Sequence, residues 1–453
     1  MYVEKSVRNN PLAAERIERL ILKFSIPAII SMLVSSLYNI VDQIFIGQGV
    51  GILGNAATNI AFPISIICTA TALLLGIGSA SNYNLSAGAG EQERACRFVG
   101  TGLSMLMICG VVIAVVILSF LNPLLHIFGV TKDVLPYAQD YTGITAFGIP
   151  FLILTTGGNH LIRADRSPTY SMICMLTGAL INTILDPLFI FGFHWGIKGA
   201  AWATVIGQVF SGGMVIIYFV SLKKMSLTLE MLKPRGIYIK GIASLGMASC
   251  INQIAIAIVQ ITMNNTLRYY GSLSVYGSDI PLACVGVIAK VNMVFMAVCI
   301  GLAQGCQPIW GFNYGAKNYE RVRKTYKRAM QIALTVGCIF FVCFQIFPRN
   351  IVSIFGDGSE EYFHFGERYF RIYMFMTFVN GIHPVSSQFF TAIGKAKLGA
   401  VVSLTRQILF LLPLILIFPV FMGIDGVMYA GPIADGTAAA VAIILALREI
   451  KKL

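Results

Sequence analysis

The chain is dominated by apolar blocks of about 20 residues that offer no polar face to water. Residues 111–121, for example, contain a single polar side chain, Ser119. An α-helix rises ~1.5 Å per residue, so ~20 residues cross the ~30 Å hydrocarbon core of a bilayer. Charged residues make up only 12% of the chain, against about 25% in soluble domains. The chain is therefore predicted to be an all-α integral membrane protein.

Twelve such blocks follow one another along the chain, and we interpret each as a spanning helix. The tenth is the least apolar because Arg368, Arg371 and His383 interrupt it. The predicted spans cover residues 21–46, 56–80, 99–121, 138–161, 169–192, 197–221, 241–267, 282–306, 326–347, 367–392, 399–421 and 424–447.

Lys and Arg are concentrated in the connectors on one side of these spans. Arg94, Arg97, Arg163, Arg166 and Lys317 are examples, whereas the connectors on the other side hold few basic residues. Cytoplasmic loops carry the excess of Lys and Arg, so we expect a multi-pass protein of the cell inner (cytoplasmic) membrane with both termini in the cytoplasm. The net charge of +13 then belongs to these loops and not to a nucleic-acid-binding surface.

The longest connector, residues 222–240, divides the predicted helices into two sets of six. We interpret it as a cytoplasmic linker between an N-lobe, residues 1–221, and a C-lobe, residues 241–453. Six helices return the chain to the side on which it started. The two lobes are therefore expected to have the same orientation in the membrane.

The two halves also match each other in sequence. Gly76 corresponds to Gly305, 229 residues later, and residues 196–199 (GIKG) correspond to residues 423–426 (GIDG), 227 residues later. Matches in order at nearly one offset indicate an internal repeat. Two parallel repeats of six helices place a substrate cavity between the lobes and suit alternating access by rocking of the lobes.

The chain lacks the sequence features of an enzyme or of an ATP-driven pump. It contains no GxxxxGK[ST] phosphate-binding loop, no catalytic triad and no nucleophile elbow, and its five histidines have no zinc-type spacing. We expect neither enzymatic activity nor a cofactor. Any transport would draw its energy from an ion gradient or from the gradient of the substrate itself.

Five ionisable residues fall within the apolar blocks, where each costs several kcal/mol unless it is paired or hydrated. They are Asp42, Asp186, Lys290, Arg406 and Asp435. The sequence leaves the roles of the last three open. Lys290 and Arg406 could form charge pairs or line a wet cavity, and Asp435 could pair with Arg406.

Each of the other two acids has an asparagine on the same helix face. Asn39 lies three residues before Asp42, and Asn182 lies four residues before Asp186. Carboxylate and amide oxygens are ligands for a hard cation such as Na⁺, and a carboxylate near another in a low dielectric can take up a proton. These four residues are predicted to bind the coupling ion, H⁺ or Na⁺, and no other metal site is expected. A purely structural role, capping neighbouring helices, is the alternative.

Polar and Met-containing helix faces in the second half are candidates for a substrate cavity. Such a surface suits varied apolar cations, although ordinary helix packing would also explain the Met residues. The candidates are Gln253, Gln260, Asn264, Lys290, Met293, His383 and Arg406.

Three segments resemble the multidrug and toxic compound extrusion (MATE) transporters, in particular their bacterial MepA-like and DinF-like branch. They are residues 24–47 (FSIPAIISMLVSSLYNIVDQIFIG), 182–192 (NTILDPLFIFG) and 305–317 (GCQPIWGFNYGAK). The resemblance covers essentially the whole chain, and the first two motifs are highly specific. It implies a V-shaped fold of twelve helices that exports cationic or amphipathic drugs in exchange for H⁺ or Na⁺.

The resemblance to the DinF-like branch also implies a coupling site in the N-lobe. The positions that match are Asp42, Asn182 and Asp186, to which Thr204 on the sixth helix and Asn159 on the fourth are added. The NorM-like branch uses acids on the seventh and tenth helices instead. Here the seventh helix has no acid and the tenth has His383, so coupling in the N-lobe is favoured.

The sequence thus predicts a cation-coupled multidrug antiporter that acts as a monomer on small drug-like molecules within the bilayer. A lipid-linked precursor flippase of the same broad fold group is the alternative, because Lys290 and Arg406 would suit an anionic headgroup. A channel or receptor is disfavoured, since the chain has no filter-like motif and no soluble sensing domain. Neither the physiological substrate nor the choice between H⁺ and Na⁺ follows from the sequence.

Overall fold

The computed structural model describes residues 10–277, 279–354 and 359–453, and all regular structure in these residues is helical. The first half contains α2 (Pro11–Ala14), α3 (Ile17–Gly49), α4 (Ile52–Gly88), α5 (Gln92–Ser119), α6 (Leu121–Ile127), α7 (Leu135–Thr145), α8 (Ile149–Ala164), α9 (Pro168–Pro187) and α10 (Gly196–Ile217). The second half contains α11 (Gly236–Ser272), α12 (Asp279–Gly315), α13 (Tyr319–Ile346), α14 (Pro348–Ser353), α15 (Glu360–Tyr373), α16 (Thr377–Asn380), α17 (Ile382–Ala392), α18 (Ala396–Leu404), α19 (Leu412–Met422) and α20 (Ile424–Ile450). Short π-helical stretches cover Leu188–Gly192, Tyr218–Leu222 and Thr405–Leu411.

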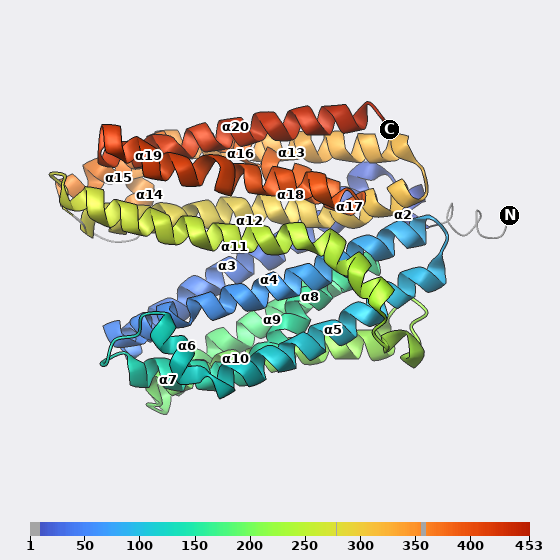
Figure 1. Cartoon of the computed structure of the whole chain (residues 1–453), viewed down its shortest axis with the longest axis horizontal. Helices are drawn as coiled ribbons and strands as arrows, with labels where there is room; N and C mark the ends of the chain where they lie inside the picture. The colour runs from blue at the N-terminus through green and yellow to red at the C-terminus, as the bar shows by residue number, and fades with distance from the viewer. Residues whose placement is uncertain (1–9, 278, 355–358) are drawn as a thin grey trace.

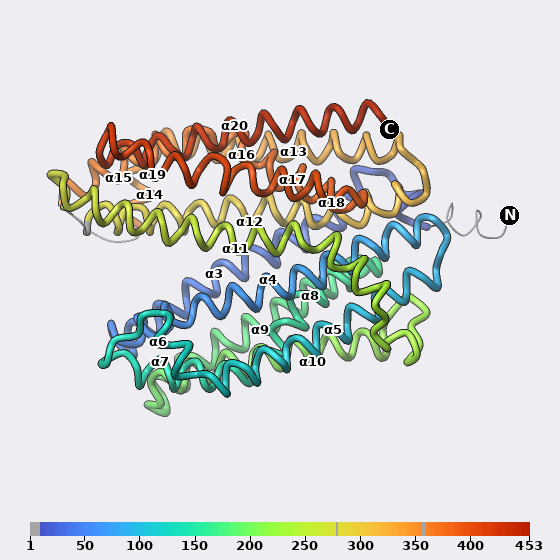
Figure 2. The backbone as a smooth tube through the Cα atoms, viewed as in Figure 1, coloured from blue at the N-terminus to red at the C-terminus, as the bar shows by residue number. Residues whose placement is uncertain are grey.

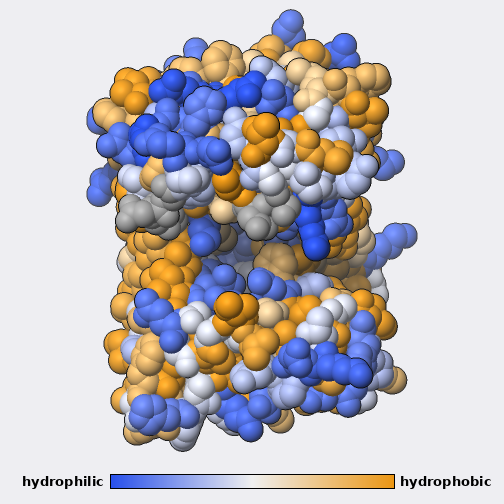
Figure 3. Space-filling view, turned by 90° about the vertical axis from the view of Figure 1, so that its left-hand side faces the viewer, coloured by the Kyte–Doolittle hydropathy of each residue, from blue (hydrophilic) through white to orange (hydrophobic). Residues whose placement is uncertain are grey.

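The helices form two bundles (Figure 1), and the path of the chain through both can be followed in Figure 2. Helices α3 to α10 form the first bundle and α12 to α20 the second, while α11 starts beside the first bundle and continues along the second. We call the side with α2 and the C-terminus the terminal side and the opposite side the open side. Figure 3 looks onto the open side and shows a hollow between the two bundles.

Two of the twelve predicted spans are broken helices. Ten helices in the described residues are long and apolar enough to cross a membrane. The predicted span 138–161 is instead split between α7 and α8, and the predicted span 367–392 is split among α15, α16 and α17. The helix that resumes has a proline near its start in both cases, Pro150 in α8 and Pro384 in α17. Proline has no N–H to donate to the preceding turn, so helices commonly restart at such positions.

The outer faces of the bundles are apolar. On α5, Val111, Val112, Val115 and Val116 are between 46% and 55% exposed. Leaving such surface in water is unfavourable by about 25 cal/mol per Å². A contiguous belt of this kind is stable only against another apolar phase, which for helices of this length is the lipid bilayer.

The internal repeat is visible in the backbone. Gly196, which opens α10, and Gly423, which directly precedes α20, have φ angles of 55° and 60°. This left-handed region is one that glycine enters without steric cost. Helices α4 and α12 both have 37 residues, and their last residues, Gly88 and Gly315, are again 227 positions apart.

Hydrogen bonds join the two bundles near the terminal side. The Ser25 hydroxyl of α3 donates to the carbonyl of Leu302 in α12 over 3.3 Å, and the Gln307 amide of α12 donates to the Ser81 hydroxyl of α4 over 2.9 Å. Helix α11 begins at Gly236, inside the connector that the sequence places at 222–240. The lobe boundaries derived from that connector stay a prediction.

Candidate functional site

A cavity of about 580 Å³ lies between the bundles. Most of its wall comes from α3, α4, α8, α9 and α10 of the first bundle, and α11 and α12 complete it. Apolar side chains such as Leu152, Met293 and Met296 alternate with polar groups. A cavity of this size and mixed character can enclose a drug-sized organic molecule.

Two acids from different helices meet beside this cavity. Asp42 on α3 and Asp186 on α9 bring their carboxyl groups within hydrogen-bonding reach of each other. Asp186 is fully buried, whereas Asp42 is half-buried and lines the cavity. The buried Oδ1 of Asp42 has no hydrogen-bond partner among the described residues. Two carboxylates this close repel each other strongly unless a proton or a cation is shared between them.

No basic side chain of the described residues is paired with the two acids. Within residues 10–277, 279–354 and 359–453, no lysine, arginine or histidine forms an ion pair with Asp42 or Asp186. Tyr38 and Tyr141 line the same cavity. The described residues therefore provide no ion-pair partner for either acid.

Asn182 links Asp186 to α10. Its side-chain nitrogen lies 3.4 Å from Asp186 Oδ1 and 3.2 Å from the Thr204 hydroxyl. Rotating the amide by half a turn satisfies both neighbours better: the nitrogen then donates to Asp186 Oδ2 over 3.1 Å, and the oxygen accepts from the Thr204 main-chain N–H over 3.2 Å. The amide thus fixes the position of the Asp186 carboxylate.

The helix around Asp186 is locally irregular. Pro187 ends α9, and because proline has no N–H, the carbonyl of Thr183 loses its usual helical partner. A π-helical stretch, Leu188–Gly192, follows at once. Such stretches free main-chain groups and often accompany functional sites. The irregularity places polar backbone groups next to the buried acid.

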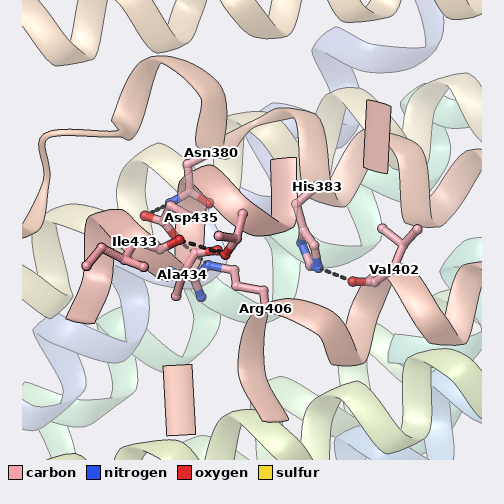
Figure 4. A network of polar contacts seen from close by, with 8 residues as sticks. Asn380, His383, Val402, Arg406, Ile433, Ala434 and Asp435 are labelled. Atoms are coloured by element: carbon pink, nitrogen blue, oxygen red, sulfur yellow. Dashed lines mark hydrogen bonds and ion pairs between the residues drawn. The ribbon is translucent and has the colours of Figure 1, made fainter. Parts of the chain in front are cut away.

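The second bundle holds its own buried acid, which is neutralised (Figure 4). Arg406 Nε donates to Asp435 Oδ1 over 2.6 Å, and the Asn380 amide donates to the other carboxylate oxygen over 3.2 Å. His383 lies close by, and its Nε2 is 2.9 Å from the carbonyl oxygen of Val402. The ion pair suggested by the sequence therefore exists, and the charge of Arg406 is balanced within the second bundle.

The two helical bundles can be compared with known proteins. The MatE family profile matches residues 27–188 and 248–417, well over half of the chain. The chain belongs to the MatE family. The resemblance noted in the sequence is thereby confirmed, and this MatE chain is a membrane transporter and not an enzyme.

Curated relatives extend the match to nearly the full length of the MatE chain. The multidrug export protein MepA of Staphylococcus haemolyticus (strain JCSC1435) is 26% identical over 432 residues, which cover 94% of this chain and 92% of the relative. The protein of the same name from Staphylococcus aureus (strain MSSA476) is 25% identical over 433 residues, with the same coverage of both chains.

Solved structures show the same fold. One, described as the outward-facing conformation of a multidrug resistance MATE family transporter of the MOP superfamily, has a TM-score of 0.90 and 23% identity, with 100% of this chain and 98% of that chain covered. A MOP superfamily transporter from Pyrococcus furiosus, whose title refers to a reverse polarity of the binding pocket, has a TM-score of 0.88 and 22% identity, with the same coverage. The predicted fold of twelve helices in two repeats is confirmed.

The predicted coupling residues of the MatE chain only partly converge. The group that comes together consists of Asp42, Asp186, Asn182 and Thr204. Asn39 lines the same cavity, but its amide donates to the carbonyl of Ser35 over 2.6 Å. Asn159 also lines the cavity, and no hydrogen bond joins it to either acid within the described residues.

The predicted substrate residues are divided among three locations. Gln253 and Met293 line the cavity. Gln260, Asn264 and Lys290 lie farther along α11 and α12 toward the open side and are exposed. Contrary to the prediction, His383 and Arg406 do not line this cavity, because both are buried within the second bundle by the contacts just described. A cationic cavity of the kind that the flippase alternative requires therefore cannot use Arg406.

Three residues near the cavity were missed by the sequence analysis as site residues. Arg163 was counted among the loop charges, yet it belongs to the last turn of α8 and lines the cavity. Its position four residues after Asn159 was the available signal, since this spacing puts both on one helix face. Tyr38 and Tyr141 were overlooked because tyrosines are common at membrane interfaces and carry no charge.

Proposed function

We propose that this protein exports cationic or amphipathic organic compounds across the cell inner membrane in exchange for H⁺ or Na⁺. The name of the curated relatives, multidrug export protein, supports this substrate class. The cavity of about 580 Å³ supports it as well, because its methionines can adapt to varied apolar cations. The proposed ion site needs no residue from a second copy, which is compatible with a functional monomer.

The distribution of basic residues supports an orientation for the transporter. Arg94, Arg97, Arg166, Lys224 and Lys317 lie at helix ends or in connectors of the terminal side. By the positive-inside rule this side faces the cytoplasm, together with both termini. In this orientation the open side faces outward, where a substrate would leave and a coupling ion would enter.

The observation that carries the proposal is the contact between Asp42 and Asp186 without a basic partner in the described part of the chain. A proton shared between the two carboxyl groups would remove their repulsion. Na⁺ would do the same, held by oxygen atoms of Asp42, Asp186, Asn182 and Thr204, which is the ligand type that hard cations prefer. Asp435 is already paired with Arg406, so it does not need a proton or Na⁺ to balance its charge.

Helix α3 connects the ion site with the contact between the bundles. Its first half carries Ser25, which bonds to α12, and its second half carries Asp42, which faces α9. Pro27 lies between them and interrupts the hydrogen-bond ladder of the helix. Binding or release of an ion at Asp42 therefore acts on α3, the helix that holds the terminal side closed. This links ion binding to the alternating access of the cavity.

The energy available is sufficient for efflux. One elementary charge that crosses a membrane potential of 100 mV releases ~2.3 kcal/mol. Each 1.4 kcal/mol corresponds to about a factor of ten, so this charge drives roughly 50-fold accumulation of a substrate without net charge on the far side. Exchange of one coupling ion for one organic monocation moves no net charge, so that efflux draws its energy from the concentration gradient of the coupling ion.

Efflux of ethidium from membrane vesicles tests the proposal directly, with pH and Na⁺ gradients imposed separately. We expect one of the two gradients to drive efflux in the wild type, which identifies the coupling ion, and Asp42→Asn to abolish that response. Asp140→Asn is the matched control, because Asp140 is an exposed acid of the same bundle that pairs with Lys198. Ion-driven efflux that survives in Asp42→Asn would contradict the proposed ion site.

The same assay discriminates the flippase alternative. If neither gradient drives ethidium efflux in the wild type, antiport of organic cations is wrong for this protein. Transport of anionic lipid-linked sugars by the reconstituted protein would then be measured. Lys290, which is exposed on α12 toward the open side, would be the first residue to substitute in that assay.

A further inference from the structure

A second, smaller cavity lies where the two bundles meet on the terminal side. Its volume is about 260 Å³. Helix α4, the start of α5 and the end of α8 supply most of its wall, while α12 contributes Phe312 and α2 contributes Leu12. None of the described residues lines both this cavity and the larger one beside the acid pair. The smaller cavity is therefore a separate candidate site.

Asn84 of α4 presents an unpartnered amide to the smaller cavity. Its side chain is 1% exposed, and in the described residues neither its nitrogen nor its oxygen has a hydrogen-bond partner. The side chain fits between the bundles because residue 311 of α12 is glycine: a Cβ atom at Gly311 would lie 2.8 Å from the Cβ of Asn84. Buried amides are normally paired, so Asn84 indicates that a polar ligand completes this cavity.

Arg166 brings a positive charge to the same cavity in a rarely occupied backbone conformation. It lies in the turn between α8 and α9 with a φ of 61°, the left-handed region that few residues other than glycine adopt. The corresponding turn of the second bundle, between α17 and α18, has Gly394 with a φ of 80°. Residues held in this region cluster at functional sites. Arg166 forms no ion pair within the part of the chain that the structure describes.

The acids near this cavity are engaged elsewhere. Asp165 accepts two hydrogen bonds, over 2.6 and 2.8 Å, from the end of the first bundle and the connector that follows it. Glu91 forms an ion pair with Arg94 over 2.8 Å. Glu93 forms one with Arg97 over 2.9 Å. None of these three acids lines the cavity, and among the described residues that do, the one charged side chain belongs to Arg166.

The polar side chains around the cavity come from four separate segments. Asn10 precedes α2, and its oxygen accepts from the Leu12 main-chain N–H over 3.1 Å, which leaves its nitrogen as a donor. A carboxylate offers two oxygens in one plane, whereas a phosphate offers three strong acceptor oxygens in different directions. Donors from several segments around one guanidinium therefore suit phosphate better. The four polar residues are Asn10, Asn84, Gln92 and Arg166.

We propose that this cavity binds a phosphate group, carried by a small phosphate ester or by a lipid headgroup. Both bundles form its wall, and α2 is held on the second bundle because the Asn313 amide of α12 donates to the Leu12 carbonyl over 3.0 Å. The wall is thus intact only while the terminal side is closed. A bound phosphate favours that closed state, so the site regulates the protein and does not depend on which ion is coupled.

Hydrogen exchange of the purified full-length protein tests the site. In maltoside detergent, which contains no phosphate, inorganic phosphate should slow exchange in peptides from the ends of α4 and α12. Chloride at matched ionic strength is the reference, because any salt screens a guanidinium. Arg166→Gly should weaken phosphate binding about tenfold, the scale of one charge-assisted contact, and should fold, because glycine adopts a φ of 61° without steric cost. Arg323→Gln, an exposed arginine near the start of α13, is the control and should keep the wild-type affinity.

Two further probes distinguish the sources of the phosphate. Slower exchange with glycerol 3-phosphate in detergent would assign a soluble ester, and slower exchange in nanodiscs with phosphatidic acid than with phosphatidylcholine would assign a lipid headgroup. Asn84→Leu removes both unpartnered atoms and should weaken either effect.

No protection by inorganic phosphate, glycerol 3-phosphate or phosphatidic acid would overturn the site. Equal protection of the wild type and Arg166→Gly would overturn it as well. Because these experiments measure binding and not transport, their outcome is independent of the antiport mechanism. Failure of ion-driven ethidium efflux with intact phosphate protection would contradict the proposed transport function alone.

Discussion

Gly88 at the end of α4 and Gly315 at the end of α12 lie against each other's helices where the two bundles meet. A Cβ atom at Gly88 would overlap the carbonyl oxygen of Phe312, and one at Gly315 would overlap the carbonyl oxygen of Leu85. Gly88 and Gly315 are 227 positions apart, and so are Leu85 and Phe312. This is the spacing of the internal repeat. The contact is therefore symmetric between the repeats, and only glycine permits it.

Gly315→Leu should prevent the terminal side from closing. The new side chain meets a main-chain oxygen that cannot move aside, so the bundles must separate at this point. We expect roughly tenfold faster hydrogen exchange in peptides from the ends of α4 and α12, equivalent to ~1.4 kcal/mol. Gly286→Leu is the control on the same helix, since a Cβ at Gly286 meets nothing within 4 Å. Identical exchange in both variants would mean that the bundles do not separate at this junction.

Thr204→Val should weaken binding of the coupling ion. The substitution removes the hydroxyl that lies 3.2 Å from the Asn182 side chain, so the amide that positions Asp186 loses a partner. Loss of one buried hydrogen bond costs about 1 to 1.5 kcal/mol. The ion concentration for half-maximal ethidium efflux should rise about tenfold. Thr204→Ser keeps the hydroxyl and should behave as the wild type, and a similar rise in both variants would exclude this role of the hydroxyl.

Asp435→Asn should destabilise the second bundle without uncoupling transport. The substitution leaves Arg406 as a buried, unpaired charge, which costs ~3 kcal/mol or more. The melting temperature in detergent should fall clearly below that of the wild type. The double variant Arg406→Met with Asp435→Leu should recover much of this loss of thermal stability, because both charges are removed together. Loss of the ion dependence of efflux in the double variant would show that the second bundle takes part in coupling.

The buried Asp165 should make the stability of the protein pH-dependent. It lies in the turn between α8 and α9, outside the spanning helices, and accepts hydrogen bonds from the Lys224 main-chain N–H over 2.6 Å and from the Tyr218 hydroxyl over 2.8 Å. Burial raises the pKa of the Asp165 carboxyl, although these hydrogen bonds oppose the rise. The folded state thus binds more protons than the unfolded state between the ordinary and the raised pKa.

The sign of the effect follows from this difference in bound protons. The free energy of unfolding of the wild type should increase, relative to Asp165→Asn, as the pH falls through the raised pKa of Asp165 toward the ordinary value of 3.8, and this gain is lost as the pH rises through the raised pKa. Thermal unfolding of both proteins, measured from neutral pH down toward that ordinary value, gives the difference. A difference that stays constant over this range would mean that Asp165 has the same pKa in the folded and unfolded states.

Most of the fold could be predicted from the sequence because a bilayer allows few solutions. Blocks of about 20 apolar residues must form helices, since every backbone group has to be hydrogen-bonded internally. The two exceptions are instructive. In 138–161 and 367–392 the apolar content predicts a continuous span, but Pro150 lies at the start of α8 and Pro384 at the start of α17, and the break between α15 and α16 has no proline. Breaks of this kind are tolerated in membranes where surrounding groups satisfy the backbone, which a single segment does not reveal.

The candidate site could be predicted only in part. The ionisable residues and their i, i+3 and i, i+4 partners identified Asp42, Asp186 and Asn182, because spacing within one helix fixes which side chains share a face. Spacing does not reveal what lies opposite that face. The sequence therefore grouped Arg406 and His383 with the cavity, although the structure buries both in the second bundle.

The sequence by itself determined that this chain spans a membrane, repeats a six-helix unit and carries acids at membrane depth. These properties depend on composition and local periodicity, and the cost of placing polar groups in hydrocarbon makes both decisive. Only the tertiary structure decided which charges are paired. Asp435 meets Arg406 from another helix, whereas Asp42 meets a second acid, Asp186, and Arg163 bonds to the neutral side chains of Ser171 and Gln304. Electrostatic energy depends on distances between helices, and those distances are set by packing across the whole bundle.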